Sequence, residues 1–274
     1  MASPHSANAQ PDTMNSRIRF TIATVTWNAA PVLQRTLDSV ASQDYPDVEH
    51  LIIDGQSKDN TMQMVEAYKQ ANTSAHEIVA ISEPDKGLYD AMNKALAMAT
   101  GDYILFLNAG DKFHAADTLS LIAKTAQTNA DGYLLPGVIY GHTDIVDDNG
   151  QFLRHRRLAP PEKLTWESFT DGMLVCHQAF FANMVVASEL TYDTNYRFSA
   201  DYDWCIRIMK EATRLHMPLS NAHIVVADYL DGGMTTQNHR KSLIERLKVM
   251  AHHYGWAKAI GQHIYFVFRA IKAK

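Results

Sequence analysis

The chain has 274 residues, of which 46% are hydrophobic and 20% charged, and it carries 13 glycines and 9 prolines. This composition is typical of a globular protein and excludes collagen-like, disulfide-dense and wholly disordered chains. The net charge of −5, from 25 basic and 30 acidic residues, argues against a general nucleic-acid binder.

The two ends of the chain and its cysteines indicate a cytoplasmic location. Residues 1–17 are polar and lack the apolar core of a signal peptide, so we expect a disordered leader. No run of eighteen apolar residues predicts a membrane span. Cys176 and Cys205 lack the CxxC spacing, which indicates buried thiols in a reducing compartment rather than a disulfide framework or a zinc site.

Four short apolar runs in the first half begin roughly every 26 to 30 residues, which is the length of a βαβ unit. The segments between them have helical periodicity, with Ser57 and Asn60 as candidate caps of the second helix and Gly101 as the end of the third. Strands that alternate with helices predict an α/β fold with a doubly wound, mostly parallel, Rossmann-like sheet. The predicted strands are 20–25, 50–53, 77–81 and 103–107.

The pattern loosens after residue 112, where we expect a seam within one compact unit. Residues 131–160 alternate and contain an Asp-Asp-Asn-Gly turn at 147–150, which predicts a β-hairpin. A helix is expected from Asp201 to Ala212, and Asp231-Gly232-Gly233 has the composition of a flexible loop. Residues 236–274 read as a basic helical tail.

The loops after the four predicted strands are the places to look for a ligand, because α/β sheets bind ligands at the carboxyl ends of their strands. Each loop contains polar residues with no evident structural role. No GxGxxG follows the first strand and no GxxxxGK[ST] occurs, which argues against dinucleotide oxidoreductases and P-loop NTPases. The four loops are 26–28, 54–59, 83–90 and 108–111.

The motifs in these loops resemble the inverting glycosyltransferases of family 2, which have the GT-A fold. They are Thr-Val-Thr-Trp-Asn at 24–28, D-G-x-S-x-D at 54–59, E-P-D-x-G-x-Y-D-A-M-N at 83–93 and N-A-G-D at 108–111. The resemblance covers about residues 18–235 and is strongest to the bacterial branch that builds O-antigen, capsular and exopolysaccharide units. It implies a nucleotide-sugar-binding half over 18–112 and a mixed acceptor-binding half over 113–235.

By this resemblance, ten residues of the first half bind the nucleotide-sugar donor. Some of them also have a structural explanation: Asp54 can close an Asx-turn, and Lys86 can be simply solvated. The neighbouring Asp59, outside the ten, can complement a helix dipole. The ten residues are Thr26, Asn28, Asp54, Gly55, Ser57, Asp85, Lys86, Asp90, Asn93 and Asn108.

The resemblance also implies a divalent ion, Mn²⁺ or Mg²⁺, at Asp111. Family members carry a D-x-D cluster there, and a hard cation of this kind prefers carboxylate and phosphate oxygens. This chain departs from the pattern, because its N-A-G-D loop has a single carboxylate. Asn108 can offer a carbonyl oxygen beside it.

The second half must supply a base, since inversion by a single displacement requires a group that takes the proton of the acceptor hydroxyl. The segment 199–204 resembles the E-D-x-D stretch of the family with Ala200 in place of Glu, and this match makes Asp201 the base. Asp203 is either an acceptor-side residue or a first-turn acid of the helix. Two further acceptor-side candidates are the pair His177-Gln178, where the histidine can also be a core residue, and Gly233 in a G-G-x-S/T loop.

The basic tail has two interpretations. Residues 240–274 contain eight basic residues and one acidic residue, which leaves a net charge of −12 on the rest of the chain. Apolar, aromatic and basic residues over 264–274 fit a helix that rests on anionic lipid, and they equally fit a helix packed on the body. The basic cluster 154–157 similarly reads as a site for an anionic acceptor or as a solvated hairpin edge.

Together these observations predict an enzyme that moves a hexose or N-acetylhexosamine from a UDP-sugar to a saccharide or an undecaprenyl-diphosphate-linked saccharide. It would act in the cytoplasm, at the inner face of the plasma membrane. A nucleotide-sugar-binding protein without turnover is the first alternative, motivated by the sparse N-A-G-D loop and by Ala200. A sugar nucleotidyltransferase is the second, but it would need a glycine-rich loop that residues 26–29 do not supply.

Overall fold

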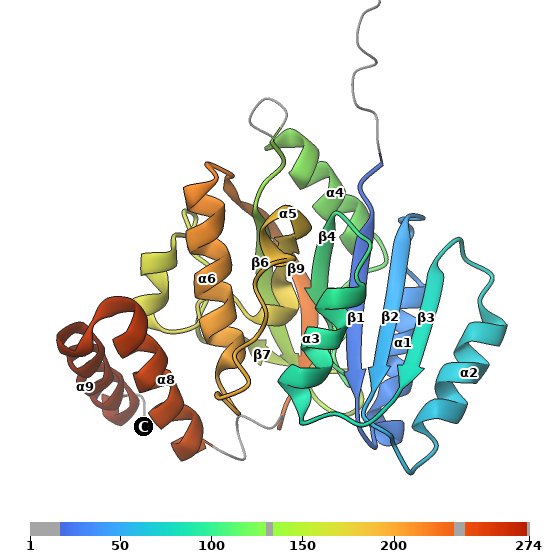
Figure 1. The fold of residues 1–274 in the computed structure, drawn as a ribbon, viewed down its shortest axis with the longest axis horizontal. Helices are drawn as coiled ribbons and strands as arrows, with labels where there is room; N and C mark the ends of the chain where they lie inside the picture. The colour runs from blue at the N-terminus through green and yellow to red at the C-terminus, as the bar shows by residue number, and fades with distance from the viewer. Residues whose placement is uncertain (1–16, 130–133, 233–238, 273–274) are drawn as a thin grey trace, which may run out of the picture.

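The computed structural model describes residues 17–129, 134–232 and 239–272 (Figure 1). The predicted leader, apart from residue 17, and Gly233 therefore lie outside the described residues. No helix in the described part is long and apolar enough to cross a bilayer.

The first half forms the predicted parallel sheet, with strand order β3-β2-β1-β4. Both β1 and β2 are buried along their whole length, because helices cover the sheet on both faces. All four predicted strands are confirmed within two residues at each end. The strands are β1 (Phe20–Thr26), β2 (Val48–Asp54), β3 (Glu77–Ser82) and β4 (Tyr103–Phe106); the helices between them are α1 (Ala30–Ala41), α2 (Thr61–Ala71) and α3 (Leu88–Met98).

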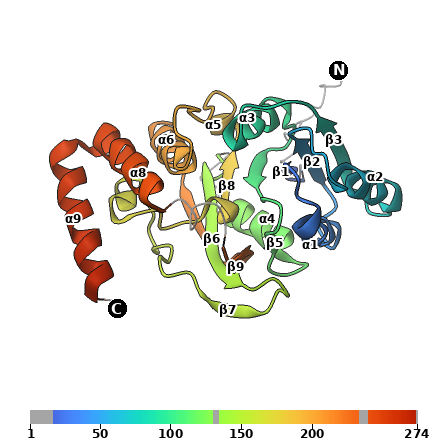
Figure 2. The ribbon, with the colours of Figure 1, turned by 90° about the horizontal axis from the view of Figure 1, so that it is seen from below.

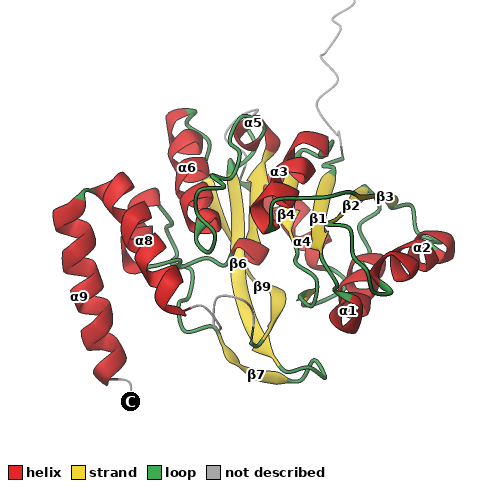
Figure 3. Cartoon of the chain, turned by 60° about the horizontal axis from the view of Figure 1, so that its bottom comes forward, coloured by secondary structure: helices red, strands yellow, loops and turns green. Residues whose placement is uncertain are grey.

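The same sheet continues through the second half in the order β4-β8-β6-β9-β5. The strand β9 runs parallel to β6, whereas β8, β7 and β5 make antiparallel pairs. The predicted hairpin is present as β6 and β7, joined across the turn at 147–150 (Figure 3). The strands are β5 (Lys112–Phe113), β6 (Val138–Val146), β7 (Phe152–His155), β8 (Phe180–Asn183) and β9 (Leu219–Leu230); the helices are α4 (Thr118–Thr128), α5 (Met184–Ala187) and α6 (Ala200–Arg214), with 3-10 helices η1 (Trp166–Asp171) and η2 (His177–Ala179).

The alternation of side chains along β1 separates two helical layers. Ala23 and Val25 pack in a core cluster with residues of α3 and α6, and Phe20 and Ile22 pack in a second cluster with residues of α4. The helices α3 and α6 accordingly cover one face of the sheet, and α1, α2 and α4 the other (Figure 1). This is the doubly wound arrangement that the sequence predicts.

The tail is helical as predicted, but it consists of two helices, α8 (His239–Tyr254) and α9 (Trp256–Lys272). They are divided at Gly255, whose φ of +84° is a conformation that other residues rarely adopt. The outermost helix, α9, packs on α8 and η1 through Ala259 and Phe266, and Gln262 donates to Asp171 at 2.8 Å (Figure 2).

The predictions for two helix ends need correction, although Asn60 does occupy the N-cap position of α2. The N-terminus of α2 is satisfied by Asp59, whose carboxylate accepts from Thr61 N at 3.0 Å, while the side chain of Asn60 makes no cap bond. Ser57 instead bonds to Asp54. The helix α3 ends at Met98, and Gly101 lies beyond it, where a Cβ atom would stand 2.6 Å from Thr21 N. The glycine therefore permits a close backbone approach rather than a helix cap.

Candidate functional site

The carboxylate of Asp54, at the end of β2, organises the first two strand-end loops. It is completely buried and accepts four hydrogen bonds: from Thr26 Oγ1 at 2.9 Å, Ser82 Oγ at 2.7 Å, Ser57 N at 2.9 Å and Ser57 Oγ at 2.5 Å. Burial alone would raise the pKa of Asp54, but these donors outweigh it and lower the pKa. The side chain therefore acts inside the protein, as the Asx-turn explanation expects, and holds Thr26 and Ser57 in place.

A second pair of bonds joins the β1 loop to the β2 loop. Asn28 has a positive φ of 48°, its backbone N–H donates to Ser57 Oγ at 2.7 Å, and its Oδ1 accepts from Lys58 N at 2.9 Å. Asparagine tolerates this left-handed conformation better than most residues. The two loops thus form one rigid rim at the carboxyl end of the sheet.

The third loop contacts this rim at Gly55. A Cβ atom on Gly55 would lie 2.3 Å from Asp85 Oδ2, so only glycine lets the Asp85 carboxylate come this close. Asp85 accepts from Gly87 N at 2.8 Å and Asp90 from Lys86 N at 3.0 Å, which shapes the loop before α3. The Lys86 side chain is exposed at the same loop.

Asn93, on α3, has both polar atoms of its amide bonded to the backbone of Tyr192. Its amide donates to Tyr192 O at 3.0 Å and its Oδ1 accepts from Tyr192 N at 2.7 Å. Both polar atoms are therefore used to fix α3 against the segment that precedes α6, and the geometry favours a structural role over donor binding.

Trp27 is a candidate that the motif analysis did not single out as a site residue. It directly follows β1, and 71% of its surface is exposed, although a tryptophan usually buries most of its area. An exposed aromatic ring at the rim of a strand-end site offers a stacking surface for a nucleobase. Its signal in the sequence is only its place between Thr26 and Asn28.

Asp111 is buried in the loop between β4 and β5. Its Oδ2 accepts from Gln178 Nε2 at 2.7 Å and its Oδ1 from Leu230 N at 3.0 Å. Burial raises the pKa of Asp111 to about 6, although these two donors, His177 and Arg35 all act to lower it. Asp111 has no salt bridge among the described residues, and a desolvated carboxylate of this kind can bind a cation.

The residues around Asp111 fit a divalent cation. Asn108 Oδ1 is a buried acceptor that has no hydrogen-bond partner in the described part of the chain. It begins the turn that Asp111 closes, where Asp111 N donates to Asn108 O at 3.0 Å. An amide oxygen and a carboxylate are suitable ligands for Mg²⁺ or Mn²⁺, and donor phosphates would complete the shell.

A different group of possible metal ligands lies on β6, on β9 and directly after β5. His114, Asp144 and Asp228 have ligand atoms within 4.8 Å of one another. All three residues already take part in ion pairs: Asp228 contacts Lys112 at 3.0 Å and His114 at 2.7 Å, and Asp144 contacts His155 at 2.8 Å. The ammonium group of Lys112 beside Asp228 opposes a second cation there. These ion pairs therefore account for the clustering of the three residues without a metal ion.

Asp201 begins α6 and is held from two sides. Tyr89 Oη donates to its Oδ1 at 3.1 Å, and His177 Nδ1 lies 3.2 Å from its Oδ2. Burial would raise the pKa of Asp201, but the hydrogen bonds from His177 and from the backbone of Tyr202, together with the charge of Arg246, outweigh it and lower the pKa. The carboxylate is thus ionised at neutral pH, as a proton acceptor must be.

Two hydrogen bonds join the loop after β4 to η2. Asn108 Nδ2 lies 3.0 Å from His177 Nε2, and Gln178 Nε2 donates to Asp111. Because His177 also contacts Asp201, a continuous chain of contacts runs from the Asn108–Asp111 loop to the start of α6. The predicted metal, acceptor-side and base residues are therefore brought together at one place.

Asp203, two residues along α6, is not part of this chain of contacts. It is buried and pairs with Arg207 at 2.7 Å and with His253 at 2.8 Å. Burial acts to raise its pKa, and these partners lower it instead. Asp203 thus attaches the tail helix α8 to α6, which favours the structural explanation over an acceptor-side role.

Two residues of the basic cluster 154–157 also make their contacts within the protein. Arg154 pairs with Asp231 at 3.0 Å, and Arg156 donates to the backbone carbonyls of Leu158, Met173 and Leu174. These two guanidinium groups are therefore engaged within the protein, and a site for an anionic acceptor made of the whole cluster is not favoured.

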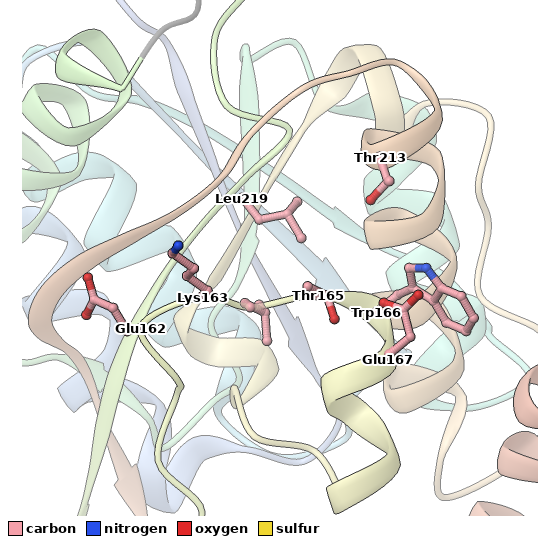
Figure 4. Close-up of a pocket in the computed structure, with 8 residues that line it drawn as sticks. Glu162, Lys163, Thr165, Trp166, Glu167, Thr213 and Leu219 are labelled. Carbon is pink, nitrogen blue, oxygen red and sulfur yellow. The ribbon is translucent and has the colours of Figure 1, made fainter. Parts of the chain in front are cut away.

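A hollow of about 330 Å³ lies beside η1 and is separate from this site (Figure 4). Thr213 of its lining is twelve residues along α6 from Asp201, which is roughly 18 Å along a helix axis. The hollow therefore opens at the other end of α6. Its lining residues are Glu162, Lys163, Leu164, Thr165, Trp166, Glu167, Thr213 and Leu219.

Comparison with known sequences agrees with the motifs in these loops. The family described as Glycosyl transferase family 2 matches residues 21–190. A PGL/p-HBAD biosynthesis glycosyltransferase of Mycobacterium bovis BCG is 30% identical over 230 residues, which cover 83% of this chain and 83% of the relative. The amylovoran biosynthesis glycosyltransferase AmsB of Erwinia amylovora is 29% identical over 220 residues, covering 76% of this chain and 70% of the relative.

Comparison with solved structures agrees with the fold. Residues 1–349 of S. aureus TarS in complex with UDP-GlcNAc superpose with a TM-score of 0.68 at 16% identity, covering 91% of this chain and 73% of that one. A mannosyltransferase of Pyrobaculum calidifontis, in complex with GDP-Man and Mn²⁺, gives a TM-score of 0.55 at 17% identity, with coverages of 90% and 74%. At such identities the likeness shows the fold alone, which is the GT-A fold. The chain belongs to glycosyltransferase family 2 and is a glycosyltransferase.

Proposed function

We propose that this glycosyltransferase moves a hexose or N-acetylhexosamine from a UDP-sugar to a saccharide or lipid-linked saccharide, with inversion at the anomeric carbon, in the synthesis of a cell-surface polysaccharide. The observation that carries the proposal is the continuous set of contacts from Asp111 and Asn108 through His177 to Asp201. This arrangement supports a cation-binding loop and a proton acceptor within one site, as single displacement at a sugar carbon requires.

The donor is placed on the rim formed by the first three strand-end loops. Trp27 stacks on the nucleobase, and the exposed Lys86 lies at the rim where the diphosphate passes. The relatives support the type of donor, since TarS was crystallised with UDP-GlcNAc. The mannosyltransferase of Pyrobaculum calidifontis was crystallised with GDP-Man. The preference for uracil over guanine is therefore our proposal.

Asp111 and Asn108 are the residues that would hold Mn²⁺ or Mg²⁺. When bound, the cation would neutralise the negative charge of the diphosphate leaving group. Asp201 then receives the proton of the acceptor hydroxyl while the acceptor oxygen bonds to the anomeric carbon. The bond from that carbon to the phosphate oxygen breaks, its electron pair leaves with the nucleoside diphosphate, and the carboxylate ends as a carboxylic acid.

Nucleotide binding is the experiment that tests the donor site. Thermal melting of the full chain should be measured with UDP, GDP, CDP and dTDP, each with and without Mn²⁺. Because a ligand stabilises the folded state according to its concentration over Kd, we expect UDP with Mn²⁺ to raise the Tm by several degrees. A shift with GDP alone would contradict the UDP assignment, and no shift with any nucleotide would contradict the donor site.

A binding protein without turnover is the alternative function. It predicts the same Tm shifts but no release of UDP from a UDP-sugar, with or without acceptor. Substitution of the base separates the two functions: Asp201→Asn should bind UDP as the wild type does while losing transfer.

We further propose that α9 rests on an anionic membrane, where a lipid-linked acceptor would be found. Its inner face uses Ala259 and Phe266, whereas Trp256, Ile260 and Ile264 recur every four residues on the outer face and are 47–61% exposed. Lys258 is exposed on the same helix. Exposed apolar and aromatic residues next to basic ones are typical of interfacial helices, and the positive charge of the tail matches anionic lipid.

Flotation with vesicles tests this membrane contact. The wild type should bind vesicles that contain phosphatidylglycerol, less so at high salt, and vesicles of phosphatidylcholine alone only weakly. Ile260→Glu should lose the binding, while Val185→Glu, at a residue 72% exposed on α5, should keep it. Equal binding of the wild type and Ile260→Glu would contradict the proposal, as would a dimer in solution that Ile260→Glu dissociates and no vesicle binding.

A further inference from the structure

Among the described residues, the side chains of Tyr89 and His177 contact one oxygen each of the Asp201 carboxylate, and they come from distant parts of the chain. Tyr89 is in the first turn of α3, 112 residues before Asp201, and contacts Oδ1. His177 begins η2 and contacts Oδ2. The first turn of α6 closes through its own backbone bond from Asp203 N to Ser199 O.

The Tyr89 ring is fixed by a stack of aromatic side chains. It stacks on Tyr192 with ring centroids 5.5 Å apart and planes at 20°, and Tyr192 stacks on Trp204 at 4.8 Å and 16°. Trp204 belongs to α6 itself and lies three residues after Asp201, so the stack and the hydrogen bond tie α3 to the same helical turn. The stack fixes the position of the Tyr89 hydroxyl, and the hydroxyl in turn restricts the motion of the Asp201 carboxylate.

The proton on His177 is placed by its second partner. Asn108 Nδ2 can only donate, so His177 Nε2 is the acceptor of that 3.0 Å bond. A ring proton on Nδ1 then donates to Asp201 Oδ2, which lies 3.2 Å away. The orientation of the Asn108 amide therefore sets the tautomer that holds the base.

We propose that Tyr89 and His177 are positioning residues that fix the Asp201 carboxylate from both sides and so aim its free lone pairs at the acceptor hydroxyl. This inference rests on the proposed function of Asp201 as the base. The two oxygens of a carboxylate can accept four hydrogen bonds, so the contacts from Tyr89, His177 and the backbone of Tyr202 leave a lone pair for the acceptor hydroxyl. Orientation of a proton acceptor affects the rate of the chemical step more than the binding of substrate.

The first test removes the tyrosine hydroxyl. Tyr89→Phe keeps the ring stack, and we expect kcat to fall about 10-fold or more while the KM values of donor and acceptor change little. Tyr68→Phe is the matched control, because Tyr68 Oη makes a similar 3.0 Å bond to the buried His50, outside the site. It should lower the Tm without changing kcat. Equal kcat values for Tyr89→Phe and the wild type would overturn the role of Tyr89.

The second test distinguishes the two nitrogens of His177. In His177→Asn the amide nitrogen takes the place of Nδ1 and can still donate to Asp201, whereas in His177→Gln it takes the place of Nε2. We expect His177→Asn to keep at least about 10-fold more kcat than His177→Gln or His177→Ala. If His177→Gln is the more active variant, or if both lose as much activity as Asp201→Asn, His177 acts through Nε2 or is itself the base, and the positioning role is wrong.

A spectroscopic readout separates this inference from the proposed function. Nitrogen-15 NMR of the histidine rings should show His177 with its proton on Nδ1 in the wild type, and a changed Nδ1 signal in Asp201→Asn. Should the wild type transfer no sugar while this signal is present, the proposed function fails and the contact itself stands. Should Asp201→Asn abolish transfer while the His177 signal is unchanged, the base is confirmed and the His177 contact is wrong.

Discussion

The amide of Gln178 donates to the buried carboxylate of Asp111 at 2.7 Å, and this bond joins the loop after β4 to the 3-10 helix η2. Gln178 is 1% exposed, so the bond is shielded from water. The neighbouring residue His177 contacts Asn108 and Asp201. The two-residue segment 177–178 therefore connects the cation-binding candidate to the base candidate.

The charge on Asp111 makes the stability of the protein depend on pH. Its folded pKa of about 6 lies above the ordinary value of 3.8, so the protonated carboxyl is favoured by folding. In the presence of EDTA, this contribution to stability should be full below pH 4 and lost as the pH rises through 6. We expect Asp111→Asn to reduce the gain in Tm on acidification.

Thermal melts of both proteins between pH 7.5 and 5 check this expectation. Mn²⁺ should stabilise the wild type above pH 6 and lose its effect below, because protons compete with the cation for the carboxylate. An equal gain in Tm on acidification for Asp111→Asn and the wild type would show that Asp111 is not the group responsible.

Asp54 provides the opposite case, a carboxylate that its surroundings stabilise. Asp54→Asn can accept only on its amide oxygen, so at least one of the donors from Ser57, Ser82 or Thr26 faces an NH₂ group. We expect a loss of about 1–3 kcal/mol in the free energy of unfolding. Urea denaturation measures it, and an unchanged midpoint would contradict the role of Asp54 as organiser of the rim.

Gly55 tests the close contact of two loops. Because a Cβ atom would stand 2.3 Å from Asp85 Oδ2, Gly55→Ala must displace that carboxylate and should raise the donor KM about 10-fold. Gly261→Ala is the control: nothing lies within 4 Å of its Cβ position, and alanine in the α9 interior should stabilise by about 0.5–1 kcal/mol. Equal donor KM values in the two variants would mean that the rim does not hold the donor.

Two exposed tryptophans separate nucleotide binding from membrane binding. Trp27 and Trp256 are 71% and 61% exposed, one beside β1 and the other at the start of α9. Trp27→Ala should weaken UDP binding by 1–3 kcal/mol, roughly the contribution of one stacked base, and leave vesicle binding unchanged. Trp256→Ala should do the reverse. Calorimetry and flotation measure the two effects, and a variant that loses both kinds of binding would contradict the assignment.

The sequence predicted the fold well because its main signal is local. Short apolar runs predict β1 to β4, and the helical periodicity of the segments between them predicts α1 to α3. Residue spacing alone is enough to find these elements. The ends of helices were less predictable: Asp59 rather than Asn60 satisfies α2, since the choice depends on side-chain rotamers. The order of β8, β6, β9 and β5 was not predicted, because these strands pair across long separations in the chain.

The candidate site shows a similar division. Motifs located Asp111, Asp201 and His177, but they could not show which polar residues are satisfied inside the protein, as Asp54 and Asp203 are. Tyr89 belongs to the motif at 83–93 but was not a predicted site residue, and its hydroxyl contact with Asp201 joins residues 112 positions apart. Such a contact leaves no signal in local spacing.

The release of UDP tests the central claim most directly. Wild type and Asp201→Asn should each be incubated with a UDP-sugar, Mn²⁺ and a lipid-linked saccharide, and followed by ³¹P NMR. Our account predicts that both bind the donor and that only the wild type releases UDP in an acceptor-dependent way. Release of UDP by Asp201→Asn at the wild-type rate would contradict it.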